Sequence, residues 1–166
     1  EKVAILTPVY YPFKKTIEAC GCRTVTSSLI NQDGVYSINF EDLETKLADP
    51  EVKMLIFCSP HNPIGRVWTK EELMKVGELC LKHDILIVSD EIHFDLILPG
   101  HEHTVFASLS KELSDRMIVC TSVSKTFNLA GMQCSNIVIS NPDLRAAYKA
   151  TMSCYINGHL NIMAYE

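Results

Sequence analysis

Short apolar runs alternate with amphipathic stretches along the whole chain. The apolar runs are rich in β-branched residues and have the length of strands; they cover residues 3–6, 23–26, 53–58, 85–89, 117–121 and 135–139. Strands that read as almost continuous apolar runs, separated by helical patterns, are typical of a parallel sheet whose two faces are both buried. The pattern therefore predicts an α/β fold of three layers, α/β/α, with a mostly parallel sheet.

Helical patterns fill most of the segments between these runs. The clearest is 69–82, where Thr69 is placed to cap the helix, Glu72 stands at the third position as in a capping box, and apolar residues recur at helical spacing. The other helices are expected at 11–20, at 40–47 with Asn39 as the N-cap, and after Pro142-Asp143. The segment 29–37 is rich in turn residues, and we interpret it as a short linker that marks no domain boundary.

Composition and charge narrow the function classes. The chain has 166 residues, of which 47% are hydrophobic and 21% charged, as in an ordinary globular domain. Its formal net charge of −5, with no basic stripe, argues against nucleic acid as a partner. Seven cysteines, an odd number mostly inside apolar runs, indicate reduced thiols and a cytoplasmic location. No apolar run approaches the roughly 20 residues that a membrane span needs, so we expect no membrane association.

The two ends of the sequence suggest a piece of a longer protein. The chain opens without Met, directly on a strand-like run, and closes at Ala164-Tyr165-Glu166 within a helical pattern.

Polar residues follow three of the predicted strands, in the segments 59–66, 90–93 and 122–128. In open parallel sheets ligands bind outside the carboxyl ends of the strands, so residues at these positions can converge on one site. Together the segments offer an amide, a carboxylate, an imidazole, hydroxyls and an amine. This combination favours a heteroaromatic cofactor that carries a phosphate.

The same segments carry a family resemblance. Ser59-Pro60-His61-Asn62-Pro63-Ile64-Gly65-Arg66, Ser89-Asp90-Glu91-Ile92-His93 and Ser122-Val123-Ser124-Lys125-Thr126-Phe127-Asn128, in that order, resemble the fold-type I pyridoxal 5′-phosphate enzymes of the class I/II aminotransferase superfamily. The His in the Asn-Pro motif, the following Arg66-Val67-Trp68 and the Asp-Glu-Ile-His string are similar to the branch of cystathionine β-lyases and related C–S lyases. The resemblance runs along essentially the whole chain.

The resemblance implies the main chemical roles. Lys125 is expected to hold the cofactor as a Schiff base and then to take the α-proton of the substrate. Asp90 is expected beside the ring nitrogen, where a carboxylate keeps the ring protonated. From the residues alone, Lys125 could be a solvated surface lysine and Asp90 a helix N-cap.

The remaining cofactor contacts are also implied by the resemblance. His93 and Asn62 match the two groups that bind the phenolic oxygen of the cofactor, although Asn62 could simply form an Asn-Pro turn. Tyr10 matches the aromatic residue that stacks on the ring, with core packing as its alternative and Tyr11 as a neighbour that could be confused with it.

For the phosphate we expect Ser122, with Ser124 as the alternative. Many family members carry an arginine several residues after the lysine as a further phosphate ligand. The sequence Asn128-Leu129-Ala130-Gly131-Met132-Gln133 has none and departs from the family there.

Other motifs give weaker signals. Cys20-Gly21-Cys22 lacks the spacing of a structural zinc pair, and His101-Glu102-His103 lies in a polar Pro-Gly loop where solvated side chains are the default. We therefore expect no metal. No glycine-rich nucleotide loop is present.

The resemblance further implies the place of this chain in a larger enzyme. Residues 1–166 correspond to the central part of the large, cofactor-binding domain, without the N-terminal segment and the C-terminal small domain, and we expect the isolated piece to be inactive. The whole protein is expected to be a homodimer that acts on an amino-acid substrate.

The expected reaction is β-elimination from a thioether amino acid such as cystathionine, which yields a thiol, pyruvate and ammonia. The alternatives are a class I/II aminotransferase and a pyridoxal-phosphate-binding domain of a transcriptional regulator.

Overall fold

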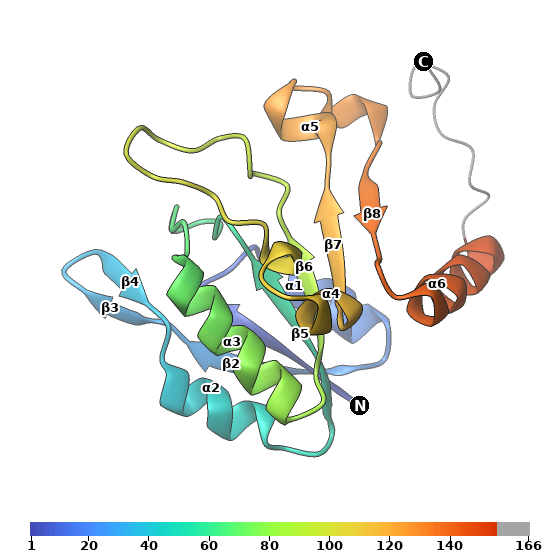
Figure 1. The fold of residues 1–166 in the computed structure, drawn as a ribbon, viewed down its shortest axis with the longest axis horizontal. Coiled ribbons are helices and arrows are strands. Elements are labelled where there is room, and N and C mark those ends of the chain that lie inside the picture. The colour runs from blue at the N-terminus through green and yellow to red at the C-terminus, as the bar shows by residue number, and fades with distance from the viewer. Residues whose placement is uncertain (156–166) are drawn as a thin grey trace.

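A six-stranded sheet runs through the centre of the molecule in the computed structural model, which describes residues 1–155 (Figure 1). Its strands, in spatial order, are β2 (Arg23–Ser28), β1 (Lys2–Thr7), β5 (Val52–Cys58), β6 (Leu86–Asp90), β7 (Met117–Thr121) and β8 (Asn136–Val138). All neighbours pair parallel except β7 and β8, which are antiparallel. The predicted mostly parallel sheet is thereby confirmed.

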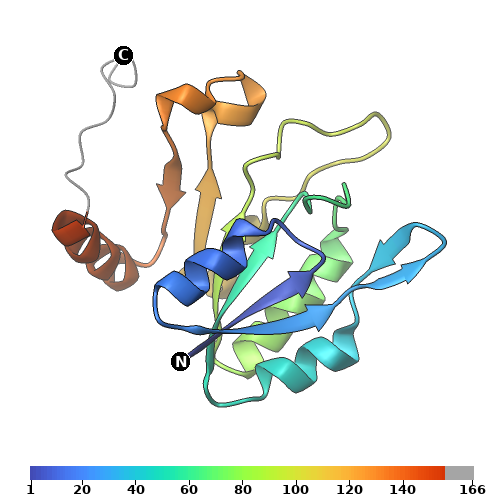
Figure 2. The same ribbon diagram turned by 180° about the vertical axis from the view of Figure 1, so that it is seen from behind.

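Helices cover both faces of this sheet. On one face lie α2 (Phe40–Leu47), α3 (Lys70–Lys82) and the short α4 (Lys111–Asp115), in front of the strands in Figure 1. On the other face lies α1 (Pro12–Ala19), which is in front in Figure 2. The single-turn α5 (Val123–Thr126) follows β7, and α6 (Pro142–Tyr155) follows β8. Two 3₁₀ turns, η1 (Phe106–Ser108) and η2 (Ala130–Met132), complete the described elements.

The core has two parts, one on each face of the sheet. The larger part lies under α2 and α3 and includes Leu55, Phe57 and Trp68, all completely buried. The smaller part lies under α1, where Ile17 packs with Ile5 and with Ile56 of β5. Because successive residues of a strand face opposite sides, both faces of β5 are apolar, which explains its nearly continuous apolar run.

Local capping explains where α3 begins. Thr69 Oγ1 accepts a hydrogen bond from the Glu72 N–H at 3.2 Å, and Glu72 Oε2 accepts one from the Thr69 N–H at 2.8 Å. This is the predicted capping box. Asn39 likewise caps α2 by accepting from the Asp42 N–H at 3.1 Å.

The segment 29–37 is a hairpin where the sequence predicted a linker. Antiparallel strands β3 (Ile30–Gln32) and β4 (Val35–Ser37) are joined by Asp33 and Gly34, both of which have positive φ. Asp-Gly suits a two-residue hairpin turn because both residues tolerate this backbone conformation. Strands of three residues are too short for alternation to be recognised, which is why the hairpin was missed.

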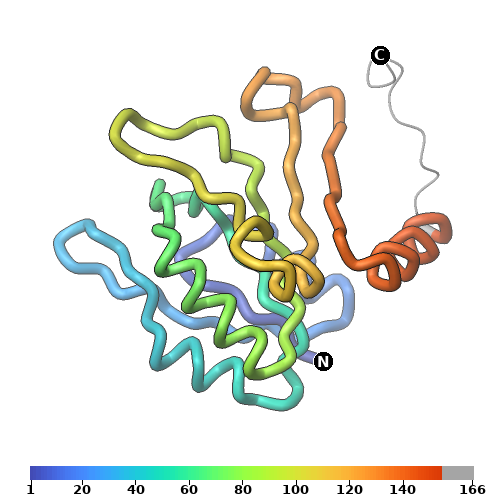
Figure 3. The backbone as a smooth tube through the Cα atoms, viewed as in Figure 1, coloured from blue at the N-terminus to red at the C-terminus, as the bar shows by residue number. Residues whose placement is uncertain are grey.

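The chain, whose path Figure 3 traces, changes direction across the sheet at β1. From β1 the chain proceeds outward to β2, and then returns to β5, β6 and β7 on the other side of β1. In such sheets the ligand-binding crevice lies at the carboxyl ends of the strands where the order reverses, here between β1 and β5. Within residues 1–155, every helix is too short or too polar to cross a lipid bilayer.

Candidate active site

Four neighbouring strands deliver the predicted site residues to the same edge of the sheet. Tyr10 follows β1, and Asn62 follows β5. Asp90 is the last residue of β6, and His93 lies just beyond it. Ser122, Ser124 and Lys125 follow β7. Backbone hydrogen bonds join the ends of the last three strands: the Ser59 N–H donates to Asp90 O at 3.0 Å, and the Glu91 N–H to Cys120 O at 2.9 Å.

The turn after β5 presents the Asn62 amide. The buried Cys58 thiol lies inside this turn, where it donates to Pro60 O at 3.2 Å and accepts from the Asn62 N–H at 3.4 Å. His61 Nε2 donates to Pro8 O at 2.9 Å and so ties the turn to the end of β1. Within residues 1–155 the side-chain amide of Asn62 has no hydrogen-bond partner, so it is free to bind a ligand.

Asp90, the last residue of β6, holds a carboxylate that lacks a cation. Its Oδ1 accepts from the Ile92 N–H at 3.2 Å, and no donor in the described part of the chain reaches Oδ2. Burial raises the pKa of Asp90, and the hydrogen bond from the Ile92 N–H together with the nearby His93 and Lys125 side chains counteracts this only in part. A turn, not a helix, follows Asp90, so the alternative role as a helix N-cap is wrong.

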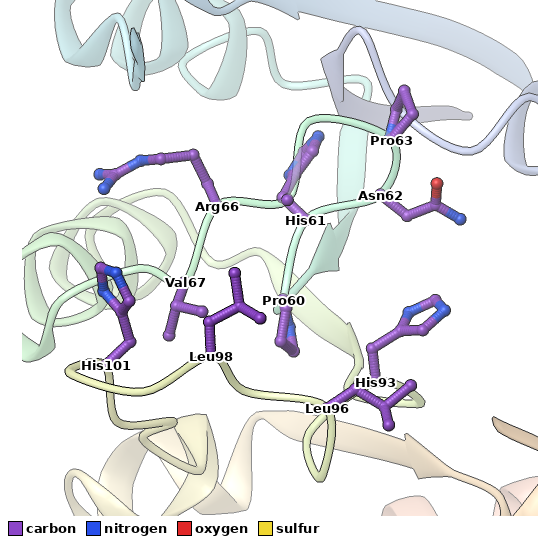
Figure 4. A pocket seen from close by; sticks show the side chains of 11 residues that line it. Pro60, His61, Asn62, Pro63, Arg66, Val67, His93, Leu96, Leu98 and His101 are labelled. Carbon is purple, nitrogen blue, oxygen red and sulfur yellow. The ribbon is translucent and has the colours of Figure 1, made fainter. Parts of the chain in front are cut away.

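His93 lies in the turn after β6, three residues beyond Asp90. Burial lowers the pKa of His93, which favours the neutral imidazole. Figure 4 shows the side chains of Asn62 and His93 extending to the same side, although they come from different strands. A hydrogen bond of 2.8 Å from Thr126 Oγ1 to Asp95 Oδ2 ties this turn to α5.

Lys125 lies in α5, which is a helical turn where the sequence predicted a loop. The side chain is exposed, and its charge lowers the pKa of both Asp90 and His93. Asn128 ends the helical turn with a φ of 56°, a left-handed conformation that asparagine tolerates well. The amine thus lies within electrostatic reach of the β6 residues.

The two serines before the lysine differ in their surroundings. Ser122 caps α5 by accepting from the Ser124 N–H at 3.0 Å, and its hydroxyl lies 2.7 Å from Cys134 O and 2.9 Å from Ser124 Oγ. Ser122 is buried, whereas Ser124 is half-buried. Ser122 therefore has a structural role, and the phosphate role of both serines stays a prediction.

Tyr10 lies in the turn after β1 and is 44% exposed. Its ring packs edge-on against Phe13 of α1, with the ring centroids 5.6 Å apart. Tyr11 is still more exposed. Tyr10 is therefore not core packing, and its ring is accessible at the β1 end of the crevice.

A cavity of about 380 Å³ adjoins two of the predicted site residues (Figure 4), whereas Tyr10, Asp90, Ser122, Ser124 and Lys125 are not part of its lining. Asn62 and His93 belong to its lining, which also includes Pro60, Val67, Leu96, Leu98 and His101. The loop that follows His93 therefore forms one wall of the cavity.

Sequence reasoning missed a buried network behind His93. His103, expected to be solvated, has a side chain only 7% exposed, and its Nε2 donates to Glu91 Oε2 at 2.8 Å. Glu91 Oε1 accepts from Ser89 Oγ at 2.9 Å and from the Phe106 N–H at 3.1 Å. No apolar pattern surrounds His103 in the sequence, so nothing local signalled its burial. Among residues 1–155, no three His, Cys, Asp or Glu side chains form a possible metal site.

Known proteins resemble this chain along nearly its whole length. The family model "Aminotransferase class I and II" matches residues 1–164. Cystathionine beta-lyase PatB of Bacillus subtilis is 49% identical over 164 residues, which are 99% of this chain and 42% of that protein.

Two solved structures also match this chain along nearly its whole length. Cystalysin from Treponema denticola, whose crystal structure contains pyridoxal 5′-phosphate, matches with a TM-score of 0.97 and 47% identity over 99% of this chain and 42% of that chain. The PLP-bound C–S lyase of Staphylococcus hominis matches with a TM-score of 0.88 and 40% identity, covering 92% of this chain and 39% of that chain. This chain thus spans about two fifths of the length of these relatives, and it belongs to the class I and II aminotransferase family.

Proposed function

We propose that the protein carrying this chain binds pyridoxal 5′-phosphate at the carboxyl edge of the sheet and cleaves the C–S bond of thioether amino acids. The observation that carries the proposal is the Asp90 carboxylate, half-buried, without a cationic partner, and within electrostatic reach of Lys125 and His93. A protonated ring nitrogen is the partner that such a carboxylate lacks.

The side chains present fit this cofactor. Asp90 Oδ2 has no donor in the described residues and can accept from the ring N–H⁺. The unpartnered Asn62 amide and the neutral His93 imidazole, which extend to the same side, can bind the phenolic oxygen. Lys125 can hold the cofactor covalently, Tyr10 can stack on the ring, and Ser122 and Ser124 can bind the phosphate. When bound, the cofactor supplies an electron sink for negative charge at the α-carbon of the substrate.

The side chains of the protein then have separate roles in the proposed reaction. Asp90 Oδ2 would accept a hydrogen bond from the protonated ring nitrogen, and the negative charge of the carboxylate would favour that protonated form. Asn62 and His93 orient the ring from the β5 and β6 ends. Lys125 Nζ becomes a free amine when the substrate amine takes its place on the cofactor, and it would then take the proton from the α-carbon and could pass it to the leaving thiolate.

A C–S lyase is the first choice because relatives covering 92 to 99% of this chain are named cystathionine beta-lyase or C–S lyase. Aminotransferase activity is the second candidate, since the matching family model is named for it. The whole protein, incubated with cystathionine and no keto acid, is expected to release pyruvate and a thiol. A strict requirement for a keto-acid acceptor would instead establish transamination.

Cofactor attachment has a direct test. Borohydride reduction of the holoprotein, followed by digestion and mass spectrometry, is expected to place the pyridoxyl group on the peptide that contains Lys125. In Lys125→Ala the label should be lost while Lys149→Ala, an exposed lysine on α6, keeps it. Label on another peptide, or none on the wild type, would overturn the proposal.

We further propose that residues 1–166 form the central part of a large domain in a cytoplasmic homodimer. The proportion of relatives that the chain covers supports the first statement, and seven free cysteines support a reducing compartment. Light scattering of the whole protein is expected to give twice the mass of one chain.

A further inference from the structure

Two side-chain hydrogen bonds hold the turn that carries His93: Thr126 binds Asp95, and His103 binds Glu91. The turn begins at Glu91, whose N–H is bound to Cys120 O, and closes with a hydrogen bond of 3.0 Å from the Phe94 N–H to Glu91 O. His103 lies against both of its ends. Its Nε2 donates to the Glu91 carboxylate at 2.8 Å, and its ring packs on that of Phe94 with centroids 6.2 Å apart.

The anchoring point is unusually firm. Glu91 is 1% exposed, and its carboxylate accepts from three donors that come from β6, from the end of the loop and from the start of η1. A buried carboxylate needs all of these donors because each unmade hydrogen bond leaves a desolvated charge. These three hydrogen bonds fix the position of the Glu91 carboxylate. The one from His103 also ties the end of the loop to the start of the His93 turn.

The rest of the loop has few other restraints. Asp95 is bound by Thr126, while Leu96 and Leu98 are exposed. His101, two residues before His103, is exposed as well. Besides His103, the far end of the loop is held beside Glu91 by the Phe106 N–H and by the Phe106 ring, which is completely buried and packs against Phe57 with the centroids 5.4 Å apart.

We propose that His103 is a positioning residue, which fixes the turn of His93 through its hydrogen bond to Glu91 and its packing on Phe94. This inference rests on the proposed function, because it concerns the orientation of His93 toward the phenolic oxygen of the cofactor. His103 itself touches neither cofactor nor substrate in this proposal.

The test compares holoenzyme variants in two measurements: the dissociation constant of pyridoxal phosphate, and the pH midpoint at which the absorbance band of the bound cofactor changes. In His103→Ala we expect cofactor affinity to fall at least about fivefold, the value of one net hydrogen bond, and the midpoint to shift. His103→Gln keeps a donor and should recover part of both. The matched control Glu102→Ala removes an exposed side chain next to His103, outside the cavity lining, and should change neither.

A double-mutant cycle separates positioning from general loss of structure. In a His93→Ala background, adding His103→Ala should leave the absorbance midpoint unchanged, because the residue through which His103 acts is gone. Additive shifts, or a His103→Ala variant indistinguishable from Glu102→Ala, would overturn the inference.

A second variant keeps the test available if His103→Ala folds poorly. Phe94→Leu removes the ring contact with His103 without changing a charge beside Asp90, so the midpoint should shift in the same direction by less. An unchanged midpoint contradicts the inference. Failure of the proposed function and failure of this inference give different results. If His93→Ala leaves cofactor affinity and midpoint unaltered, the proposed site itself is wrong. If His93→Ala changes them and His103→Ala does not, only the role of His103 is rejected.

Discussion

The Asp90 carboxylate shows how one residue can oppose stability and serve binding. Burial raises its pKa, so the ionised form is less favourable in the folded protein than in the unfolded chain. At a pH above both pKa values this costs stability, and the cost disappears as the pH falls through the folded-state pKa. A cationic ligand beside Oδ2 would remove the same cost. The buried charge that destabilises the apoprotein is thus the same charge that would favour binding of a cationic ligand.

Asp90→Asn is therefore expected to act in opposite directions on the apoprotein and the holoprotein. At pH 7 the thermal midpoint of the apoprotein should rise, because the amide keeps the Oδ1 acceptor for Ile92 without a charge. Cofactor affinity should fall about tenfold or more, the scale of a hydrogen bond to a charged group. Thermal unfolding with and without pyridoxal phosphate measures both. A variant less stable without cofactor but equally stabilised by it would contradict this account of Asp90.

The Cys58 thiol is a second residue whose chemistry is set by burial. Burial raises the pKa of Cys58 to about 12, so the sulfur stays protonated and can donate to Pro60 O while it accepts from the Asn62 N–H. Cys58→Ala should weaken cofactor binding about two- to tenfold, because both hydrogen bonds fix the turn of Asn62. The control is Cys80→Ala in α3, where burial also raises the pKa of the thiol to about 12. Titration of both apoproteins with pyridoxal phosphate should show a loss only for Cys58→Ala.

At the scale of elements, the start of α3 determines where the turn of Asn62 ends. Thr69 and Glu72 form the capping box, and Glu72 also pairs with Arg66 at 2.5 Å. Arg66 in turn lies over the Trp68 ring, 4.9 Å from its centroid. The start of α3 and the turn of Asn62 are therefore one connected unit.

Thr69→Ala should lower the free energy of unfolding by about 1 kcal/mol, the usual value of an N-cap hydrogen bond. Thr45→Ala is the control, because Thr45 is an exposed threonine within α2 whose hydroxyl donates to Glu41 O in its own helix. Its effect should stay within about 0.5 kcal/mol. Urea denaturation of the apoproteins distinguishes the two, and equal stabilities would show that the capping box does not stabilise the start of α3.

At the scale of the whole molecule, His61 joins two strand ends that are far apart in sequence. Its Nε2 reaches Pro8 O after β1, and its ring meets Trp68 edge-on at 5.4 Å. Burial lowers the pKa of His61, so the folded protein holds the neutral form while the unfolded chain binds a proton near pH 6.5. The stability that depends on neutral His61 is complete above the unfolded-state pKa and is lost as the pH falls below it.

The free energy of unfolding should therefore decline between about pH 6.5 and pH 5. His61→Asn should be less stable at pH 7.5 yet show a shallower decline. The difference between the two proteins isolates His61, because His93 and Asp90 are present in both. Chemical denaturation at a series of pH values provides the measurement, with His101→Asn at an exposed position as control. Parallel pH curves for wild type and His61→Asn would exclude His61 as the source.

Much of the architecture followed from local signals. The apolar run of β5 and the capping box of α3 were predictable because side-chain periodicity and capping depend on neighbouring residues alone. The hairpin at Asp33-Gly34 was missed because strands of three residues carry too little periodicity. The helical turn that holds Lys125 was not predicted because its four residues are too few to show helical periodicity.

The sequence by itself determined that Asn62, Asp90 and Lys125 follow parallel strands, and such strands bring their carboxyl ends to one edge. Only the tertiary structure decided that His103 is buried against Glu91 and that Thr126 binds Asp95. The physical reason is the sequence separation of the interacting residues. Strand and helix patterns arise between residues a few positions apart, whereas these polar pairs form only after the loop folds back on the sheet. Once His103 is buried, its imidazole needs a hydrogen-bond partner, and the Glu91 carboxylate is the one it meets.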